Sequence, residues 1–466
     1  MAIAMQRLAI ACAAAGAAAL APSAHAGDAP VAEGAAGLSR ADCSAGQCTF
    51  RLAPGQMLAL AEKLVLAHKY DEARPLVAAL RSAPGMEIPH GFLEGLILLG
   101  EGDAKAAAGQ FRAILQAHPE QTRVRLELAR ALLALRNYDG AEYHLRLAAE
   151  DESLPEDIAR VIGDARNVIR SNRRFRFGFD FGFAPDSNIN SATAAETIDV
   201  NFGSTRLPLE LDDAARERSG VGVTASGYAS LRLPTAEAMS LVFDTNLSMV
   251  NYEGSNLDDY TMQVAGGPEL RLDEGRTLTV QAIALNRWYG GDTAARQFGA
   301  RATLQQEIGR DKRVALQLDG RHNVSEINSG FDGWQVAANL TYEQVVERSA
   351  IVSASLIGRR EFDTVEAYSN TTLGVSGGIG GELPFGINAG LSGGATWSRY
   401  DEPQVFFSFD RREDWRLQGR AYAGLRNVRV AGFSPSAEYQ YIRVDSNYAL
   451  YQSSRHRIQF KLARFF

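Results

Sequence analysis

The chain has 466 residues, of which 46% are hydrophobic and 22% are charged. A chain of this length and composition can bury a sizeable core, so a disordered protein, a collagen-like repeat and a disulfide-stapled miniprotein are excluded. Lys and Arg total 48, Asp and Glu total 55, and the net charge is -7. Proteins that hold nucleic-acid phosphates normally carry a basic excess, so we expect no nucleic-acid partner.

Residues 1–26 have the pattern of a secretory signal peptide. The basic residue Arg7 precedes an apolar stretch from Leu8 to about Ala21, and the small-x-small triplet Ala24-His25-Ala26 follows. The apolar stretch is shorter than the roughly 18 to 20 residues that a membrane-spanning helix needs. The sequence therefore predicts cleavage after Ala26 and export of the chain, with an N-terminal membrane anchor as the alternative.

The segment after the signal peptide, 27–53, holds two cysteines, Cys43 and Cys48. Two cysteines with four residues between them in an exported protein favour a disulfide, and no further metal ligands stand nearby in the sequence. We therefore predict a local disulfide between Cys43 and Cys48, and neither a metal nor a cofactor.

Residues 54–171 repeat with a period of 34 at helical spacing. Two columns of the repeat hold small residues, and a third holds a large apolar residue. The columns are Ala61, Gly95 and Ala129; Ala73, Ala107 and Ala141; and Val77, Phe111 and Leu145. This pattern resembles the tetratricopeptide repeat. We predict an α-solenoid of about three repeats with a further helix, 156–170, as a cap, and a coincidental helical bundle is the alternative.

A solenoid of this kind presents a concave face, and the repeat register predicts which residues lie on it. Two interpretations stay open for them: they line a groove that holds a polypeptide segment of a client protein, or they pack the hairpins together. The predicted residues are Leu58, Glu62, Phe92, Leu96, Arg123, Leu126 and Arg130.

After Arg174 the periodicity changes from helix to strand. Phenylalanines at every second position from Phe175 to Phe183 alternate with small or polar residues. In a soluble sandwich the aromatic face would point to a core. In a membrane barrel it would face lipid, and the small and polar residues would face the lumen.

Strand-like segments recur to the C-terminus and number fourteen in all. Tight turns follow the even-numbered segments and generally longer links follow the odd-numbered ones, as in outer-membrane barrels, whose short turns face the periplasm. We therefore predict a 14-stranded antiparallel transmembrane β-barrel over 172–466, with the solenoid in the periplasm. The predicted strands are 174–184, 216–232, 238–252, 259–272, 277–289, 296–308, 312–325, 333–346, 349–362, 368–382, 386–400, 413–427, 428–442 and 450–466.

The last predicted strand alternates apolar residues and ends on Phe466, with Arg464 interrupting the apolar face. This ending resembles the terminal-Phe signal by which bacterial outer-membrane proteins are delivered to the barrel assembly machinery. The first and last predicted strands must pair to close the barrel. Since they are the only partners that are not neighbours in sequence, we predict a lateral opening between them. The long link 185–215 is predicted to fold into the lumen as a partial plug.

The run Pro185-Asp186-Ser187-Asn188-Ile189-Asn190 directly follows the aromatic strand. Taken alone it is an ordinary turn initiator. Together with an exported tetratricopeptide domain and a fourteen-stranded barrel, it resembles the surface lipoprotein assembly modifier family over nearly the whole mature chain. The resemblance implies an outer-membrane protein that carries client proteins, surface lipoproteins or secreted haem-binding proteins, from the periplasm to the cell surface. It also implies contact with outer-membrane lipid, and it makes the barrel assembly machinery and periplasmic chaperones candidate partners.

Sequence signals of catalysis are not found. The histidines include no His-x-x-x-His pair, and the Gly-rich stretch from Gly374 to Gly381 lies in a predicted strand with no helix after it. We therefore predict that the chain is not an enzyme. The main alternative function is that of an exopolysaccharide export porin with periplasmic helical repeats, and a small-molecule porin with an accessory domain is a third.

Overall fold

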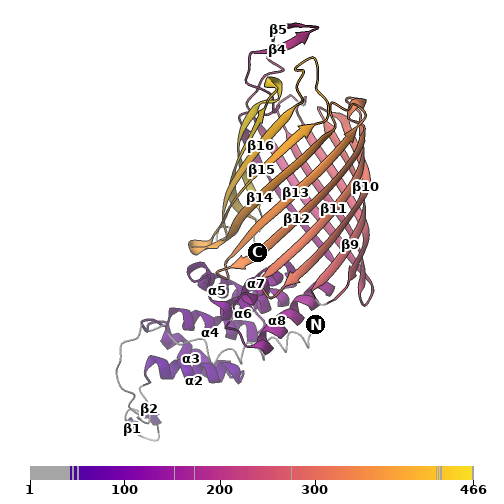
Figure 1. Cartoon of the computed structure of the whole chain (residues 1–466). Helices are drawn as coiled ribbons and strands as arrows, with labels where there is room; N and C mark the ends of the chain where they lie inside the picture. Colours follow the sequence, from indigo (N-terminus) through magenta and orange to yellow (C-terminus); the bar gives the residue numbers. More distant parts are fainter. Residues whose placement is uncertain are drawn as a thin grey trace, which may run out of the picture. The chain divides into compact units, whose positions relative to one another are not determined.

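The computed structural model describes residues 42–44, 47–49 and 52–463, apart from 152, 173, 255, 274, 427, 429, 431 and 432. The chain divides into two compact units, Met1–Arg170 and Ser171–Phe466. Figure 1 shows helices in the first unit and a barrel in the second. The predicted signal peptide and the predicted assembly signal at Phe466 lie outside the described residues.

The helices of the first unit form the predicted solenoid. Successive helices pack in pairs, α2 with α3, α4 with α5 and α6 with α7, and α8 adds Ile158 and Ile162 to the same core. In the described part of the chain no helix is both long enough and apolar enough to cross a membrane. The helices are α2 (Pro54–Leu66), α3 (Tyr70–Leu80), α4 (Glu87–Gly100), α5 (Ala104–Ala117), α6 (Thr122–Ala134), α7 (Tyr138–Ala149) and α8 (Glu156–Asn172).

The predicted repeat columns are confirmed by their burial. The five alanines of the two small-residue columns are fully buried, and so are Phe111 and Leu145. A Cβ atom on Gly95 would lie only 2.5 Å from Cε1 of the Phe111 ring, so a glycine there lets α4 approach α5. Polar residues begin the second helices: the side chains of Asp103 and Asn137 accept hydrogen bonds from backbone N–H groups in the first turns of α5 and α7.

The second unit is the predicted closed antiparallel barrel of fourteen strands, in which β18 pairs with β3 to complete the circle. The barrel strands are β3 (Phe175–Asp186), β6 (Gly220–Ala236), β7 (Met239–Asn251), β8 (Asp259–Arg271), β9 (Arg276–Tyr289), β10 (Asp292–Ile308), β11 (Lys312–Ser325), β12 (Gly333–Val346), β13 (Ala350–Asp363), β14 (Asn370–Leu383), β15 (Ile387–Tyr400), β16 (Glu413–Leu425), β17 (Ser434–Ser446) and β18 (Ser453–Ala463).

Three predicted connections were wrong in length. β6 continues to Ala236 where the predicted strand ended at residue 232, so Glu237 and Ala238 alone join β6 to β7. β10 starts at Asp292, so β9 and β10 are joined by Gly290 and Gly291 alone, both at positive φ, as a two-residue hairpin turn requires. β17 starts at Ser434 rather than at residue 428. Val430 and Phe433, which precede it, exchange backbone hydrogen bonds of 2.8 and 3.0 Å with each other and lie outside the β16–β17 ladder.

The long link between β3 and β6 contains a hairpin of its own, β4 (Thr197–Phe202) and β5 (Thr205–Glu210). Figure 1 shows this hairpin beyond the ends of the barrel strands, so the predicted folding of the link into the lumen is wrong for this part. Backbone hydrogen bonding explains its position, since Asn201 donates to the carbonyl oxygen of Phe406 at 2.7 Å in the loop between β15 and β16.

The two faces of the barrel wall differ as predicted. The five phenylalanines of β3 are 44 to 59% exposed and point outward, toward the region that lipid occupies. The alternate residues of the same strand point to the lumen. We call the end of the barrel with the β6–β7 and β10–β11 connections the turn end, and the opposite end, with the β3–β6 link, the loop end.

Candidate functional site

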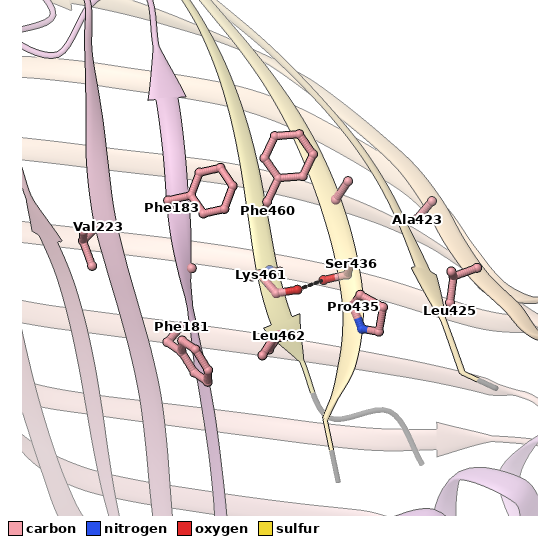
Figure 2. Close-up of a pocket in the computed structure, with 12 residues that line it drawn as sticks. Phe181, Phe183, Val223, Ala423, Leu425, Pro435, Ser436, Phe460, Lys461 and Leu462 are labelled. Atoms are coloured by element: carbon pink, nitrogen blue, oxygen red, sulfur yellow. Dashed lines mark hydrogen bonds between the residues drawn. The ribbon is translucent and has the colours of Figure 1, made fainter. Parts of the chain in front are cut away.

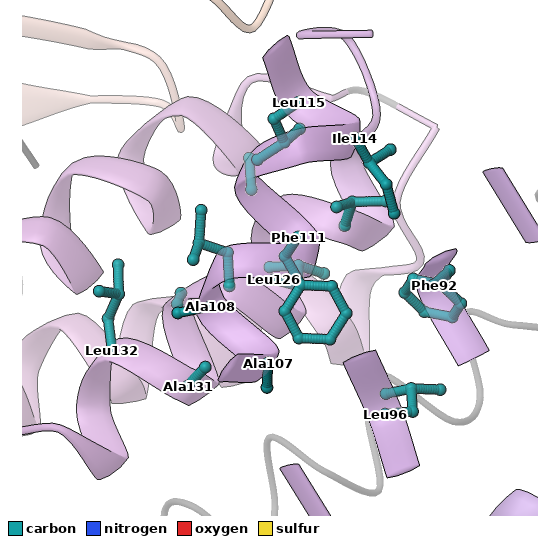
Figure 3. Close-up of a cluster of buried hydrophobic side chains, with 14 of the residues drawn as sticks. Phe92, Leu96, Ala107, Ala108, Phe111, Ile114, Leu115, Leu126, Ala131 and Leu132 are labelled. Atoms are coloured by element: carbon teal, nitrogen blue, oxygen red, sulfur yellow. The ribbon is translucent and has the colours of Figure 1, made fainter. Parts of the chain in front are cut away.

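The helical unit buries three of the residues predicted to line a groove. Phe92, Leu96 and Leu126 are 4, 9 and 0% exposed and belong to the hydrophobic core shown in Figure 3. The ring centroids of Phe92 and Phe111 lie 5.9 Å apart. For these three residues the groove interpretation is wrong and the packing interpretation applies, because the repeat column falls where one hairpin meets the next.

The other four predicted residues, Leu58, Glu62, Arg123 and Arg130, are half-buried. Arg123 joins its own repeat to both preceding repeats: its guanidinium lies 3.7 Å from a carboxylate oxygen of Glu62 on α2 and 4.5 Å from the Phe92 ring centroid on α4. Arg130 pairs with Glu127 at 3.0 Å. Glu62, Arg123 and Arg130 are therefore partly exposed charges next to an apolar core. Together with Leu58 they remain our prediction for contact with a client.

A buried arginine that the repeat pattern did not reveal organises the last hairpin. The Arg125 side chain is fully buried, and its Nε and Nη2 donate to the carbonyl oxygen of Pro119 at 2.9 and 2.6 Å. Nη1 lies 3.2 Å from Nδ1 of His144 on α7. Because these bonds use the backbone of the turn before α6, Arg125 has a structural role.

Charged and polar side chains line the lumen and pair with one another. Asp319 on β11 accepts hydrogen bonds from Arg321 of the same strand and from Arg301 of β10, the latter at 3.2 Å. Near β18, Glu438 of β17 accepts from Arg420 of β16 at 2.7 Å and from Lys461 of β18 at 3.0 Å. A lumen of this kind suits hydrated, polar material.

The pairing of β3 with β18, which we call the closure seam, is where the predicted family motif lies. Its paired residues are Arg457 with Asp186, Phe460 with Phe183, Lys461 with Gly182 and Leu462 with Phe181. Pairing skips the positions of Ala184 and Pro185, and Pro185 has no N–H to donate to the ladder. The motif thus begins at a break in the closure seam.

Asp186 connects the two sides of the closure seam. Its carboxylate is completely buried and accepts hydrogen bonds from Nε of Arg455 at 3.0 and 2.9 Å. The hydroxyl of Tyr252, in the loop after β7, donates to the same carboxylate at 3.3 Å. Burial, and next the negative charge of Asp186, raise the pKa of Tyr252 above its ordinary value, so its hydroxyl stays a neutral donor.

The next residues of the motif extend this connection. The backbone N–H of Ser187 donates to the carbonyl oxygen of His456 at 2.9 Å, and the N–H of His456 donates back to Oγ of Ser187 at 2.9 Å. The fully buried Asn188 side chain donates to the carbonyl oxygen of Ser454 at 3.0 Å. Motif residues thereby bind the backbone of β18 where the regular ladder has ended.

The last residues of the motif hold the long link. The Asn190 side chain donates to the carbonyl oxygen of Arg216 at 2.6 Å and accepts from the N–H of Arg218 at 3.1 Å. Ile189 donates its backbone N–H to the carbonyl oxygen of Arg218 at 2.7 Å. Five residues join the motif to β18 across the closure seam, and we call them the clasp: Asp186, Ser187, Asn188, Arg455 and His456.

The lipid-facing side of the closure seam has an apolar hollow of about 680 Å³ (Figure 2). It lies toward the turn end, between Phe181 on β3 and Leu462 on β18, and it reaches Leu425, the last residue of β16, and Pro435 near the start of β17. The Phe183 and Phe460 rings also line the hollow, and they pack against each other across the seam with centroids 5.2 Å apart.

Sequence reasoning identified the motif but missed its partners. Arg455 and Tyr252 contact Asp186, and Gln459 reaches past β3 to donate to the Thr224 hydroxyl of β6 at 2.7 Å. The available signal was the pair Arg455 and Arg457 in the last strand, opposite a first strand whose acidic residues are Asp180 and Asp186. Among the described residues no group of His, Cys, Asp and Glu is arranged to hold a metal ion.

Comparison with known proteins identifies the family. The model described as surface lipoprotein assembly modifier matches residues 175–466, and a tetratricopeptide repeat model matches residues 98–161. The chain belongs to the surface lipoprotein assembly modifier family. The match covers the whole barrel and includes the clasp, and the family resemblance predicted from the motif is confirmed. This member of the family is an outer-membrane β-barrel protein with an N-terminal tetratricopeptide solenoid.

Two relatives match most of this surface lipoprotein assembly modifier. The hemophilin secretion modulator of Acinetobacter baumannii is 20% identical over 391 residues, which cover 80% of this chain and 77% of the relative. Surface lipoprotein assembly modifier 1 of Neisseria meningitidis serogroup B is 22% identical over 394 residues, or 79% and 74% of the two chains. The outer membrane channel DcaP of A. baumannii covers 62% of this chain at 13% identity with a TM-score of 0.38, and 96% of DcaP is covered.

Proposed function

We propose that this protein is an outer-membrane translocator that moves specific client proteins, surface lipoproteins or secreted haem-binding proteins, from the periplasm to the cell surface. The observation that carries the proposal is the family match over the barrel, together with relatives named for surface lipoprotein assembly and hemophilin secretion. These names describe assembly and secretion. We infer that the chain acts by transport rather than by catalysis.

The solenoid is proposed to engage the client in the periplasm. The chain enters the barrel at the turn end, where β3 begins at Phe175 three residues after α8 ends at Asn172. Short turns face the periplasm in outer-membrane barrels, which supports a periplasmic solenoid. Leu58, Glu62, Arg123 and Arg130 are the proposed contact residues, and the client then passes through the lumen or along the closure seam.

Other parts of the chain are assigned by the same proposal. Residues 1–26 are the signal peptide, 27–53 an N-terminal segment, 54–171 the periplasmic helical domain and 172–466 the barrel.

In the N-terminal segment, β1 (Asp42–Ser44) and β2 (Gln47–Thr49) pair so that Cys43 stands opposite Cys48. Opposed residues of antiparallel strands are close enough for a disulfide, which supports the predicted bond. Phe466 is the proposed signal to the barrel assembly machinery, and periplasmic chaperones are proposed partners of the client.

The experiment that tests this function is deletion of the gene, followed by mass spectrometry of surface-shaved, secreted and periplasmic proteins. We expect one or two proteins to disappear from outside the cell and accumulate in the periplasm. An unchanged exported proteome with reduced surface polysaccharide would replace this function with polysaccharide export. Re-expression of the gene is the control for indirect effects.

A further inference from the structure

The closure seam is bonded unequally along its length. At the loop end the clasp holds β18 to the motif through the Asp186–Arg455 pair and through bonds to the backbone of Ser454 and His456. Gln459 adds the bond to Thr224. From there to the turn end, in the described parts of both strands, the seam consists of the backbone pairs Phe460–Phe183, Lys461–Gly182 and Leu462–Phe181, and these parts have no side-chain hydrogen bond across the seam. The charges of Asp180 on β3 and Lys461 on β18 attract each other there without a hydrogen bond.

Side chains at the turn end of β18 are bonded to β17 instead. Lys461 donates to Glu438 at 3.0 Å, and the hydroxyl of Ser436 donates to the carbonyl oxygen of Lys461 at 3.4 Å (Figure 2). The β17–β18 pairing runs without a break from Ser434–Ala463 to Val444–Ser453. When the closure seam separates at the turn end, β18 therefore stays attached to β17.

Pro185 lies between the loop-end part of the closure seam, which the clasp holds, and the turn-end part, which backbone pairs hold. The β3–β18 pairing is interrupted at Ala184 and Pro185, between Asp186 and Phe183, whereas the pairing of β3 with β6 continues through both positions. Loss of the short ladder on the turn-end side does not disturb the clasp on the other side of the interruption. The apolar hollow lies over the turn-end half, on the face that meets lipid.

We infer that the closure seam is a gate with a hinge at one end: the clasp keeps the loop end shut while the turn end separates into the bilayer. This inference rests on the proposed function and specifies its route. Asp186 is then a positioning residue, which holds the hinge without touching the client. Opening at the turn end would join the polar lumen to the apolar hollow, as the passage of a lipid-anchored protein requires.

Two cysteine pairs test the inference because they lock the two ends of the same seam separately. Phe181→Cys with Leu462→Cys locks the turn end at a directly paired position on the lipid face. Ser187→Cys with His456→Cys locks the loop end, where the two backbones are already hydrogen-bonded. Gly182 is unsuitable, since a Cβ there would lie 2.1 Å from the carbonyl oxygen of Phe460.

The probe is the epitope-tagged protein whose export the gene deletion abolishes. We expect the oxidised turn-end pair to lower its surface level at least tenfold, with recovery on reduction, and the oxidised loop-end pair to keep the wild-type level. Unimpaired export with the turn end locked overturns the inference, and so does an equal block by both locks. Single-cysteine variants under the same oxidant are the controls, and gel mobility before boiling verifies that each barrel is folded.

A second variant tests the clasp without a crosslink. Asp186→Asn removes the charge that faces Arg455 while keeping the side-chain shape, and Asp180→Asn on the same lumen-facing side of β3 is the matched control. We expect Asp186→Asn to lower the temperature at which the unboiled barrel loses its folded gel mobility by several degrees, with Asp180→Asn close to wild type. Equal effects of the two variants would contradict the clasp. If wild-type protein exports no client at all, the proposed function fails, whatever these variants show.

Discussion

Single atoms decide how closely two helices of the solenoid approach. Gly95 lies against the Phe111 ring, which is completely buried, whereas a Cβ on Gly109 of α5 would meet nothing within 4 Å. Both glycines lie within helices, where alanine is ordinarily the more stabilising residue by about 1 kcal/mol. The environment of each glycine therefore determines whether the substitution to alanine helps or harms.

We predict opposite effects for these two substitutions. Gly109→Ala should raise the stability of the helical unit by up to about 1 kcal/mol, through helix propensity alone. Gly95→Ala should lower it by about 1–3 kcal/mol, because the new methyl group displaces the Phe111 ring in a packed core. Thermal loss of the helical circular dichroism of the full-length protein measures both. A stabilising Gly95→Ala would show that α4 and α5 are less tightly packed than described.

At the scale of the element, the barrel wall is defined by which face each residue takes. Leu304, Leu316, Leu340, Leu356 and Val375 stand directly opposite one another on successive strands and point outward. The next residue of β14, Ser376, lines a polar hollow of about 230 Å³ with Ser392, Gln418 and Arg420. Neighbouring positions on one strand thus meet lipid and water respectively.

We predict that an arginine is tolerated at only one of these neighbouring positions. Val375→Arg places a charge among lipid chains and should cost about 2–4 kcal/mol if it lies near the bilayer midplane. Ser376→Arg faces the hydrated lumen and should leave the barrel assembled. The abundance of folded barrel in outer-membrane fractions, read from gel mobility with and without boiling, distinguishes the two. Equal tolerance of both substitutions would refute the assignment of the faces.

At the scale of the whole molecule, the chain consists of two compact units with separate cores. The solenoid core is built from α2 to α8, and the barrel is closed by its own strands. We therefore expect the two units to contribute separately to export.

Removal of residues 54–171 with the signal peptide retained tests this division. We predict that the shortened chain still forms a folded barrel in the outer membrane, while the client accumulates in the periplasm. Folded barrel is measured by gel mobility and the client by fractionation. Undiminished export without the helices would show that the solenoid is dispensable. Loss of the folded barrel would instead show that the solenoid is needed for barrel assembly.

The sequence by itself determined the two architectures, because each has its own periodicity of residue types along the chain. The period of 34 placed Ala73, Ala107 and Ala141 in one column, and all three are buried. Alternation every second residue gave the number of strands and the outward face of β3. Both patterns depend on neighbouring positions along the chain, so they are readable without knowledge of distant contacts.

Only the tertiary structure decided the role of the motif and of the predicted groove. Asp186 meets Arg455, 269 residues away, and Asn188 meets Ser454, 266 residues away. A local period carries no information on which strands close a barrel or in what register. Likewise the column that holds Phe92 and Leu126 was readable, but its burial was decided by the packing of one hairpin on the next. Periodicity fixes the direction of a side chain, whereas the partner it meets depends on how distant segments assemble.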